Sequence, residues 1–364
     1  MSKGLLLSAM SGGVDSSVAT ALALEAGYDV VGATLHLKGN EEAEVLAKSC
    51  CGSDDFLQVR LAAEKLGIKH EFLDRRAEFH EIVLRYSWHE YKSGRTPNPC
   101  SMCNAYIKFG LLADYARSIG AKGIITGHYA NLIRNAAGHN ELHHAKDSAK
   151  DQIYFLALLN QKQLDFCHMP LGGMCKSEVR AKAEALGLAN AKKRESQDAC
   201  FGVPGEAFSH TLKKYFNETT PGGNIVDTSG KVLGFHQGIY LYTVGQRKGL
   251  NVAMGVPAYV SEIRPVSNEV VLTTNGDDLL INEVELHNMN WLDEFPDALE
   301  CMVQLRYRQP PLAAKIYHLP ASDQLLIKLD KAISRPALGQ VGAIYAGDRL
   351  LGGGIISRSA KTAE

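Results

Sequence analysis

A glycine-containing loop between a predicted strand and a predicted helix constrains the fold of this chain more than any other feature. The apolar run at residues 5–7 indicates a short buried strand, and the helical run at residues 16–26 stops at Gly27. Between them the sequence reads Ser11-Gly12-Gly13-Val14-Asp15-Ser16-Ser17. Because glycine has no Cβ, backbone N–H groups in such a turn can converge on an anion at the helix N-terminus. The loop therefore predicts a phosphate site, although it lacks the GxxxxGK[ST] pattern of the kinase-type P-loop.

Residues 27–127 alternate between strand-like and helix-like segments, which predicts a doubly wound parallel sheet. We expect strands at 30–37, 69–73 and 123–126, and helices at 55–66, 77–92 and 105–119. Ligands of such sheets bind at the carboxyl ends of the strands. Ser11, Leu35 and Gly127 lie at three predicted strand ends, so we expect their segments to line one crevice.

In the rest of the chain, the predicted secondary structure changes from mixed helix and strand to mostly strand. A hairpin is expected at residues 130–151, and helices are expected at 152–159 and 176–186. After Pro221-Gly222-Gly223, short β-rich runs alternate with turn signals, and from residue 281 onward they indicate a small antiparallel barrel. A length of 364 residues favours two or three domains. We therefore predict an α/β domain at residues 1–205, a small β-rich domain at 206–280 and a C-terminal β-barrel at 281–364.

The composition is that of a folded protein, with 45% hydrophobic and 22% charged residues. The N-terminus leads straight into the first strand and no apolar stretch is long enough to cross a membrane, so we expect a cytoplasmic protein without membrane association. A formal net charge of −1 leaves a nucleic-acid partner open, because binding uses local basic patches. Eight cysteines are few for a disulfide scaffold, which favours catalytic or metal-binding roles for clustered ones.

Three cysteines form the second candidate site. Cys100 and Cys103 follow two prolines that fix an extended loop, and a helix is predicted to begin near Asn104, where its N-terminus would favour the thiolate. Cys200 lies on a separate loop without periodicity. The three are candidates for ordinary half-buried thiols, for a zinc site completed by Cys50-Cys51 or a histidine, or for persulfide chemistry on an activated carbon. The phosphate loop upstream favours the third interpretation, because replacing C=O by C=S requires a thiolate and an activated carbon, and a bound nucleotide is a source of that activation.

The loop resembles the SGGxDS PP-loop of the N-type ATP pyrophosphatases, and further blocks extend a resemblance over residues 9–356. In order, these blocks read Thr-Pro-Asn-Pro-Cys-x-x-Cys-Asn, Ile-Lys-Phe, Thr-Gly-His-Tyr, Lys-Asp-Gln, Ser-Gln-Asp-Ala-Cys-Phe, Val-Gly-Gln-Arg-Lys-Gly-Leu, Arg-Tyr-Arg-Gln and Gly-Gly-Gly-Ile-Ile. They occur in the order of the tRNA-specific 2-thiouridylases. The chain is therefore similar to that family over nearly its whole length, with an adenine nucleotide α-hydrolase-like first domain.

The resemblance implies ATP-dependent 2-thiolation of the wobble uridine in tRNAs for Lys, Glu and Gln. The enzyme would bind the anticodon arm and flip the uridine out of the base stack. ATP with Mg²⁺ would adenylate uracil O2, and a persulfide on Cys200 would deliver the sulfur that attacks C2. Cys103, as the nucleophile, would release that sulfur and form a transient disulfide with Cys200. A cysteine desulfurase or a sulfur-relay protein would be the sulfur donor.

The resemblance also implies two sets of binding residues. The ATP-binding set is Ala9, Met10, Ser11, Gly12, Gly13, Val14, Asp15, Ser16, Leu35 and Gly127. The tRNA-binding set is Asn98, Pro99, Cys100, His128, Lys150, Asp151, Gln152, Arg306, Tyr307 and Gln340. Arg306 and Arg308 are expected to face phosphate or the anticodon loop, which predicts binding that weakens as salt rises.

Two positions depart from the family pattern. Ala9 stands where the family commonly has glycine, and the backbone tolerates alanine there only at negative φ. Cys100 stands where many members have aspartate, so Cys100, Cys103 and Cys200 make a set of three thiolates. Three thiolates can also hold a 4Fe–4S cluster with one open iron that binds sulfide. In that alternative Cys200 is a cluster ligand and carries no persulfide.

Two further interpretations assign the chain to other functional classes than tRNA thiolation. A PP-loop amidoligase or synthetase acting on a small metabolite accounts for residues 9–127 but leaves the cysteines and the β domains without a role. A zinc-stabilised RNA-binding module without catalysis accounts for the cysteines but not for the loop. The thiouridylase interpretation predicts pyrophosphate release that depends on tRNA. The synthetase interpretation predicts release that depends on a metabolite, and the RNA-binding module would release none.

Overall fold

The structure is a computed structural model of the 364-residue chain. It describes residues 1–37, 53–193, 201–203, 205–292, 298–319 and 324–361. The chain divides into two compact units. Unit 1 comprises Met1–Val83, Cys100–Glu206 and Asp348–Leu350, and unit 2 comprises Leu84–Pro99, Ala207–Gly347 and Leu351–Glu364.

Unit 1 is built on a parallel sheet of five strands in the order β3-β2-β1-β4-β7. The strands are β1 (Leu5–Ala9), β2 (Asp29–His36), β3 (Lys69–Asp74), β4 (Ile124–Ile125) and β7 (Cys167–His168). In β1 the residues Leu6 and Leu7 are completely buried, as expected for a central strand flanked on both sides. The predicted parallel sheet is confirmed, and the structure adds β7, a two-residue strand too short to leave a periodic signal.

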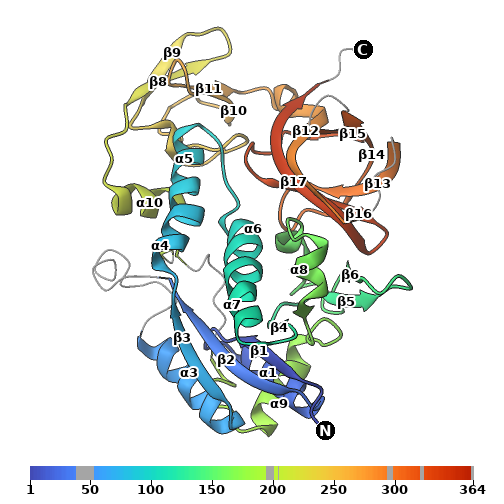
Figure 1. Cartoon of the computed structure of the whole chain (residues 1–364). Helices are drawn as coiled ribbons and strands as arrows, with labels where there is room; N and C mark the ends of the chain where they lie inside the picture. The colour runs from blue at the N-terminus through green and yellow to red at the C-terminus, as the bar shows by residue number, and fades with distance from the viewer. Residues whose placement is uncertain (38–52, 194–200, 204, 293–297, 320–323, 362–364) are drawn as a thin grey trace. The chain divides into compact units, whose positions relative to one another are not determined.

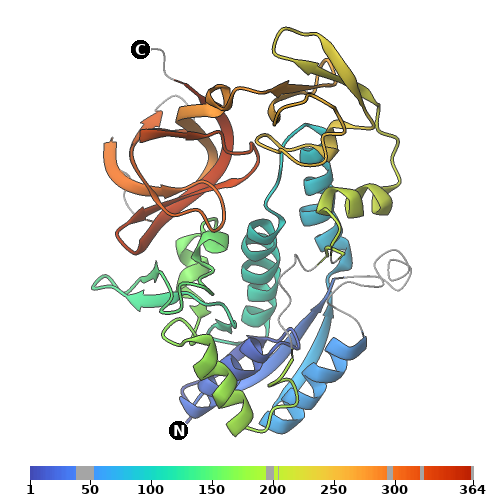
Figure 2. The same cartoon turned by 180° about the vertical axis from the view of Figure 1, so that it is seen from behind.

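Three helices pack on this sheet and share its core. They are α1 (Val14–Glu25), α3 (Ser53–Leu66) and α9 (Lys176–Ala185). α1 and α9 lie side by side (Figures 1 and 2), and Val18 of α1 and Val179 of α9 belong to one buried cluster with Leu6 of the sheet. α1 is almost wholly buried because its sequence is rich in Ala, Ser and Val, small residues that allow close approach to the sheet.

A continuous helical segment carries the CxxC motif. It consists of α6 (Pro99–Met102), the π-helical η2 (Cys103–Leu111) and α7 (Leu112–Ser118). The helix therefore begins at Pro99, and the prediction of a start near Asn104 is wrong. Proline is favoured at the first helical position because its missing N–H is not needed there. Both cysteines thus lie within the helix rather than before it.

The remaining elements of unit 1 include the predicted hairpin. Its strands are β5 (Asn131–Arg134) and β6 (Asn140–His143), and the turn η3 (Ile153–Leu156) and helix α8 (Gln161–Asp165) follow. The helix expected at residues 152–159 is reduced to the single 3₁₀ turn η3. The helical stretch predicted at residues 77–92 consists of α4 (Arg76–Phe79), the π-helical η1 (His80–Arg85) and α5 (Tyr86–Lys92).

Unit 2 begins with α5 and α10 (Phe208–Phe216), which meet around one carboxylate. Glu218 accepts hydrogen bonds from Trp88 Nε1 at 2.9 Å and from Lys92 Nζ at 2.5 Å. A four-stranded sheet follows in the order β10-β11-β8-β9. Its strands are β8 (Gly223–Asp227), β9 (Val232–His236), β10 (Tyr259–Arg264) and β11 (Glu269–Thr273), with the turns η4 (Ile239–Leu241) and η5 (Gly276–Leu279).

The C-terminal part of unit 2 is a closed antiparallel barrel, as predicted (Figure 1, orange to red). Its six strands are β12 (Leu280–Trp291), β13 (Ala298–Gln304), β14 (Leu312–Leu319), β15 (Gln324–Ser334), β16 (Val341–Ala346) and β17 (Arg349–Ala360). β12 pairs with both β15 and β17, which closes the ring and removes exposed strand edges. In the described part of the chain, no helix is both long and apolar enough to cross a lipid bilayer.

Candidate functional site

The glycine loop leaves the carboxyl end of β1 and runs directly into α1. Met10 N donates to Ala33 O at 2.8 Å, and Thr34 Oγ1 donates to Met10 O at 2.7 Å, so β2 fixes the start of the loop. Gly12 has φ +75°, a conformation that favours glycine. Gly13 is the N-cap of α1, and no side chain caps the helix there. The first N–H groups of α1 therefore face a position suited to an anion.

Serine hydroxyls brace the loop from inside. Ser16 Oγ donates to Gly13 O at 3.1 Å and accepts from Ser11 N at 3.2 Å. Ser17 Oγ also donates to Gly13 O, at 3.2 Å. These contacts hold the loop in one shape before any ligand arrives, which lowers the ordering cost of binding. Ala9 is the last residue of β1 and pairs with Ala33 in extended backbone, so the alanine at this position causes no strain.

Asp15 is the charged centre of the loop. Lys176 Nζ lies 2.7 Å from each carboxylate oxygen of Asp15, and Tyr129 OH donates to Oδ1 at 2.8 Å. The Lys176 side chain is only 11% exposed, whereas that of Asp15 is 29% exposed. Neither Lys176 nor Tyr129 was predicted as a binding residue from the sequence. No local pattern marks Lys176, because its partner lies 161 residues away in the sequence.

Gly127 closes the loop from the neighbouring strand. It follows the carboxyl end of β4, and an added Cβ would lie 2.7 Å from Ser16 N and 2.8 Å from Asp15 C. Leu35 occupies the corresponding end of β2 and is half-buried. Because β2, β1 and β4 are neighbours in the sheet, the predicted meeting of these three segments at one sheet edge is confirmed. Whether each residue touches ATP stays a prediction.

Two of the three candidate cysteines lie one helical turn apart. Cys100 is half-buried and Cys103 is 6% exposed, and a spacing of three places both on one face of the helix. Cys200 and Cys50-Cys51 lie outside the described residues. Burial raises the pKa of Cys301 to about 12 and raises the pKa of Cys167 well above its ordinary value, so both are neutral thiols at pH 7. Among the described residues, no three His, Cys, Asp or Glu side chains gather as a metal site.

The predicted tRNA residues of unit 1 are buried or half-buried. His128 is 9% exposed, and burial, followed by the nearby Lys108 charge, lowers its pKa well below the usual value. Asp151 accepts hydrogen bonds from Ala145 N at 2.6 Å and from Ile153 N at 3.0 Å. Gln152 Oε1 accepts from Tyr129 N at 3.0 Å, and Lys150 is half-buried. Gln152 therefore holds the backbone at Tyr129, and Asp151 holds the backbone at Ala145 and Ile153.

The predicted tRNA residues of unit 2 belong to three separate segments of the chain. Arg306 is exposed and Tyr307 is half-buried in the turn after β13, where Arg308 has φ +63°. Asn98 is 7% exposed, and Pro99 begins α6.

The amide of Gln340 points toward the loop that carries Asn98. Its Nε2 donates to Thr96 O at 2.9 Å and to Pro97 O at 3.0 Å. Thr96 N also donates to Leu338 O at 2.7 Å. In this structure Gln340 therefore holds the loop backbone.

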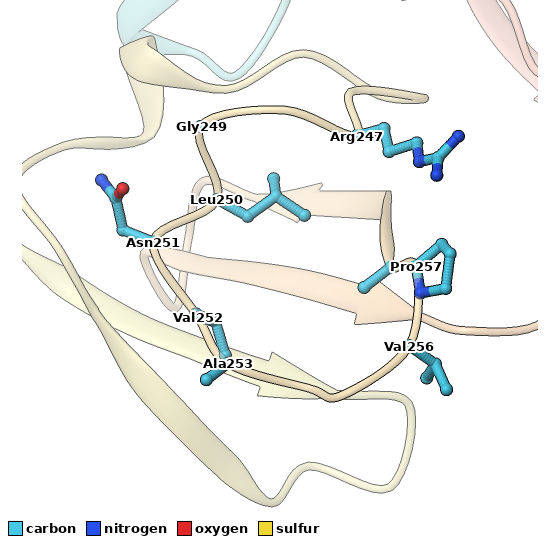
Figure 3. Close-up of a pocket in the computed structure, with 9 residues that line it drawn as sticks. Arg247, Gly249, Leu250, Asn251, Val252, Ala253, Val256 and Pro257 are labelled. Carbon is cyan, nitrogen blue, oxygen red and sulfur yellow. The ribbon is translucent and has the colours of Figure 1, made fainter.

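A pocket of about 540 Å³ lies in the small β-rich part of unit 2 (Figure 3). It is lined by Arg247, Gly249, Leu250, Asn251, Val252, Ala253, Val256, Pro257 and Ala258. None of the residues in the predicted ATP or tRNA sets lines it, although the pocket contains part of the Val-Gly-Gln-Arg-Lys-Gly-Leu block. Its lining has no acid, base or nucleophile suited to catalysis.

The fold and the loop define a class: a parallel α/β protein with a PP-loop-type anion site after its first strand, extended by a small β module and a β-barrel. Three family descriptions match the chain in this order. They are "tRNA methyl transferase HUP domain" over residues 5–203, "tRNA methyl transferase PRC-barrel domain" over 209–274 and "Aminomethyltransferase beta-barrel domain" over 281–356.

The chain belongs to the tRNA-specific 2-thiouridylase family. It is 40% identical to the tRNA-specific 2-thiouridylase MnmA of Lachnoclostridium phytofermentans, covering 95% of this chain and 98% of that protein. The protein of the same name from Geotalea uraniireducens is 41% identical, covering 97% and 95%. Among solved structures, a 4-thiouridine synthetase–RNA complex with bound ATP aligns over 58% of this chain and 50% of that chain, at 16% identity and a TM-score of 0.36.

Proposed function

We propose that this chain is an ATP-dependent tRNA-uridine 2-sulfurtransferase that forms 2-thiouridine at the wobble position. The observation that carries the proposal is the similarity of about 40% identity, over nearly the full length, to proteins named tRNA-specific 2-thiouridylase. The uncapped loop at α1 supplies a site for ATP, and Cys103 supplies the nucleophile that acts together with Cys200. We also propose that the protein is cytoplasmic and that its three domains span residues 1–205, 206–280 and 281–364.

The first step is activation of the base by ATP. The ATP-binding set holds the β- and γ-phosphates at the N-terminus of α1, where unpaired N–H groups favour negative charge. Uracil O2 attacks the α-phosphorus, the bond to the β-phosphate oxygen breaks, and pyrophosphate leaves. Asp15, a hard oxygen ligand at the loop, is the residue that would hold Mg²⁺, which would neutralise phosphate charge. Lys176 contacts both carboxylate oxygens of Asp15 and so orients them.

The second step transfers sulfur. The terminal sulfur of a Cys200 persulfide becomes bonded to C2 of the adenylated base, and AMP leaves with the former O2. Cys103 thiolate attacks the Cys200 sulfur as the S–S bond of the persulfide breaks, and a Cys103–Cys200 disulfide forms. A thiol reductant restores both cysteines. A cysteine desulfurase or a relay protein recharges Cys200 before the next turnover.

The substrates are the tRNAs for Lys, Glu and Gln, bound through the anticodon arm. Base chemistry requires the wobble uridine to leave the stack, and Asn98, Pro99 and Cys100 are the residues that contact it. Arg306 is exposed in its turn, as a phosphate contact must be. The β-rich domain at residues 206–280 contributes further tRNA contacts.

A second candidate for the sulfur step is motivated by Cys100, which lies one turn before Cys103 on the same helix face. Together with Cys200, these thiolates would hold a 4Fe–4S cluster whose open iron supplies sulfide. Iron and acid-labile sulfide in anaerobically purified protein separate the two routes. A visible absorption band with stoichiometric iron, lost in Cys100→Ala, supports the cluster. A colourless protein that thiolates tRNA with a desulfurase supports the persulfide.

The proposed function is tested by measuring pyrophosphate release from ATP with and without tRNA. We expect release only when both ATP and tRNA are present, and none from Asp15→Ala. Release that needs a small metabolite instead of tRNA would identify an amidoligase or synthetase. Binding of tRNA without any pyrophosphate would identify a non-catalytic RNA-binding module. Retained adenylation in Asp15→Ala would overturn the assignment of the loop.

A further inference from the structure

A buried asparagine lies behind the nucleotide loop and contacts its backbone. Asn190 follows α9 in the sequence and is 1% exposed. Its Nδ2 donates to Gly12 O at 3.2 Å and to Ser17 Oγ at 2.9 Å. The side chain thus joins the loop before α1 to the first turn of α1, from a segment 178 residues away in the sequence.

The contact with Gly12 O determines which way a peptide group of the loop faces. In a trans peptide, the carbonyl and the following N–H point in opposite directions. Asn190 at 3.2 Å, and Lys193 Nζ at the longer distance of 3.5 Å, hold the Gly12 carbonyl on the buried side, so the Gly13 N–H is turned toward the anion position. Two glycines flank this peptide, so no Cβ resists its rotation and an outside contact must choose its orientation.

A second observation separates this contact from simple packing. Asn190 Oδ1 is fully buried and has no hydrogen-bond partner within the described part of the chain. An unsatisfied buried oxygen costs about 1–3 kcal/mol. An apolar side chain of similar size would avoid that cost, so packing alone does not explain an amide at this position.

We propose that Asn190 is a positioning residue that keeps the Gly13 N–H directed at the β- or γ-phosphate of ATP. The inference rests on the proposed function, since it assigns the loop to ATP. Removal of the amide lets the Gly12–Gly13 peptide rotate and place a carbonyl oxygen against the phosphates. Ligands that carry the β- and γ-phosphates should therefore bind more weakly, whereas the binding of AMP should not change.

The test compares the dissociation constants of ATP and AMP in the full-length chain with those of Asn190→Leu. Leucine has nearly the shape of asparagine, offers no donor and removes the unsatisfied oxygen. We expect ATP to bind about tenfold more weakly, with AMP binding and the melting temperature nearly unchanged. Asn190→Asp keeps the volume and loses the donor, and it is expected to weaken ATP binding selectively even if the leucine variant does not fold.

Asn104 offers a matched control. It is also a buried amide of unit 1, with Nδ2 donating to Phe155 O at 3.1 Å and with Oδ1 lacking a partner among the described residues. Asn104→Leu should leave ATP affinity unchanged. An Asn190→Leu protein that binds ATP like wild type, or that loses ATP and AMP equally, would overturn the inference alone. A wild-type chain that binds no ATP would overturn the proposed function and the inference together.

Discussion

Gly127 shows how little space a single position near the nucleotide loop allows. An added Cβ would meet the backbone of Asp15 and Ser16, which cannot move without displacing the first turn of α1. We predict that Gly127→Ala lowers the free energy of unfolding by about 1–3 kcal/mol and weakens ATP binding. Denaturant unfolding and ATP titration measure the two effects.

Gly173, in the same unit, is the control for this substitution, because an added Cβ there would meet nothing within 4 Å. Gly173→Ala should leave both quantities close to those of wild type. If Gly127→Ala and Gly173→Ala have the same free energy of unfolding and the same affinity for ATP, the loop does not need the close approach of Gly127.

Lys176 is the residue most directly responsible for the geometry of Asp15. We predict that Lys176→Met reduces tRNA-dependent pyrophosphate release at least about tenfold and leaves tRNA affinity unchanged, because Asp15 loses the charge partner that orients it. Pyrophosphate release and tRNA binding are measured on the same preparation.

Lys182→Met is the matched control on the same helix. Lys182 pairs with Glu25 at 2.8 Å, but Glu25 is 50% exposed, and such surface pairs contribute only about 0–1 kcal/mol. Its pyrophosphate release should equal that of wild type. Unchanged release in Lys176→Met would remove Lys176 from the mechanism.

These single residues also show where sequence reasoning stops. Residues 11–17 were recognisable because consecutive residues form the loop, and their order alone carries the signal. Lys176 and Asn190 could not be recognised in this way, because neither belongs to a local pattern. Lys176 contacts Asp15, 161 residues away, and Asn190 contacts Gly12, 178 residues away. Their roles follow only from the packing of α9 and the segment after it against α1.

At the scale of elements, the loop before α6 depends on a contact from the barrel within unit 2. Gln340 Nε2 donates to Thr96 O and Pro97 O, directly before Asn98. We predict that Gln340→Leu lowers the rate of thiolation at saturating tRNA, because the loop that holds the target base loses two hydrogen bonds. Single-turnover thiolation and tRNA affinity together measure the effect. Weaker tRNA affinity with an unchanged rate would instead identify Gln340 as a direct tRNA contact.

The connection between β6 and η3 predicts a pH dependence of stability. The hydrogen bond to Asp151, acting against burial, raises the pKa of His144 above 6.5 in the folded state. A raised folded-state pKa stabilises the protein fully below the unfolded-state value, and this contribution is lost as pH rises through the folded-state pKa. His144→Gln should therefore destabilise the chain more at about pH 5.5 than at about pH 8.5.

Urea unfolding of wild type and His144→Gln at both pH values measures this difference. The comparison within one pH removes the contributions of the other histidines, including His128, whose pKa is lowered by burial. A larger loss of stability in the variant at the alkaline pH would contradict the stated direction.

Element boundaries were the least predictable feature of the sequence. The helix of the CxxC motif was expected to begin near Asn104 because two prolines precede it, but the second proline is itself the first helical residue. β7 was missed because two residues cannot show a period, although it completes the parallel sheet beside β4. Helices with a clear local signal were predicted well: α3 has apolar residues at helical spacing, and α1 ends just before Gly27.

For the whole molecule, the change in periodicity correctly predicted a parallel α/β half followed by a β-rich half. In the structure, Leu84–Pro99 groups with the second half of the chain in unit 2. That segment reads as helix and loop, and only contacts such as Trp88 with Glu218 and Thr96 with Leu338 assign it to unit 2. Periodicity reports local structure, whereas membership of a compact unit depends on distant partners.

The central claim is that this chain replaces O2 of a tRNA uridine by sulfur at the expense of ATP. The most direct measurement is mass spectrometry of nucleosides from digested tRNA after incubation with the full chain, ATP and a desulfurase with cysteine. The account predicts 2-thiouridine at the wobble position of tRNAs for Lys, Glu and Gln, dependent on ATP and absent with Asp15→Ala. Pyrophosphate release without any thionucleoside, or sulfur at another position of the tRNA, would contradict it.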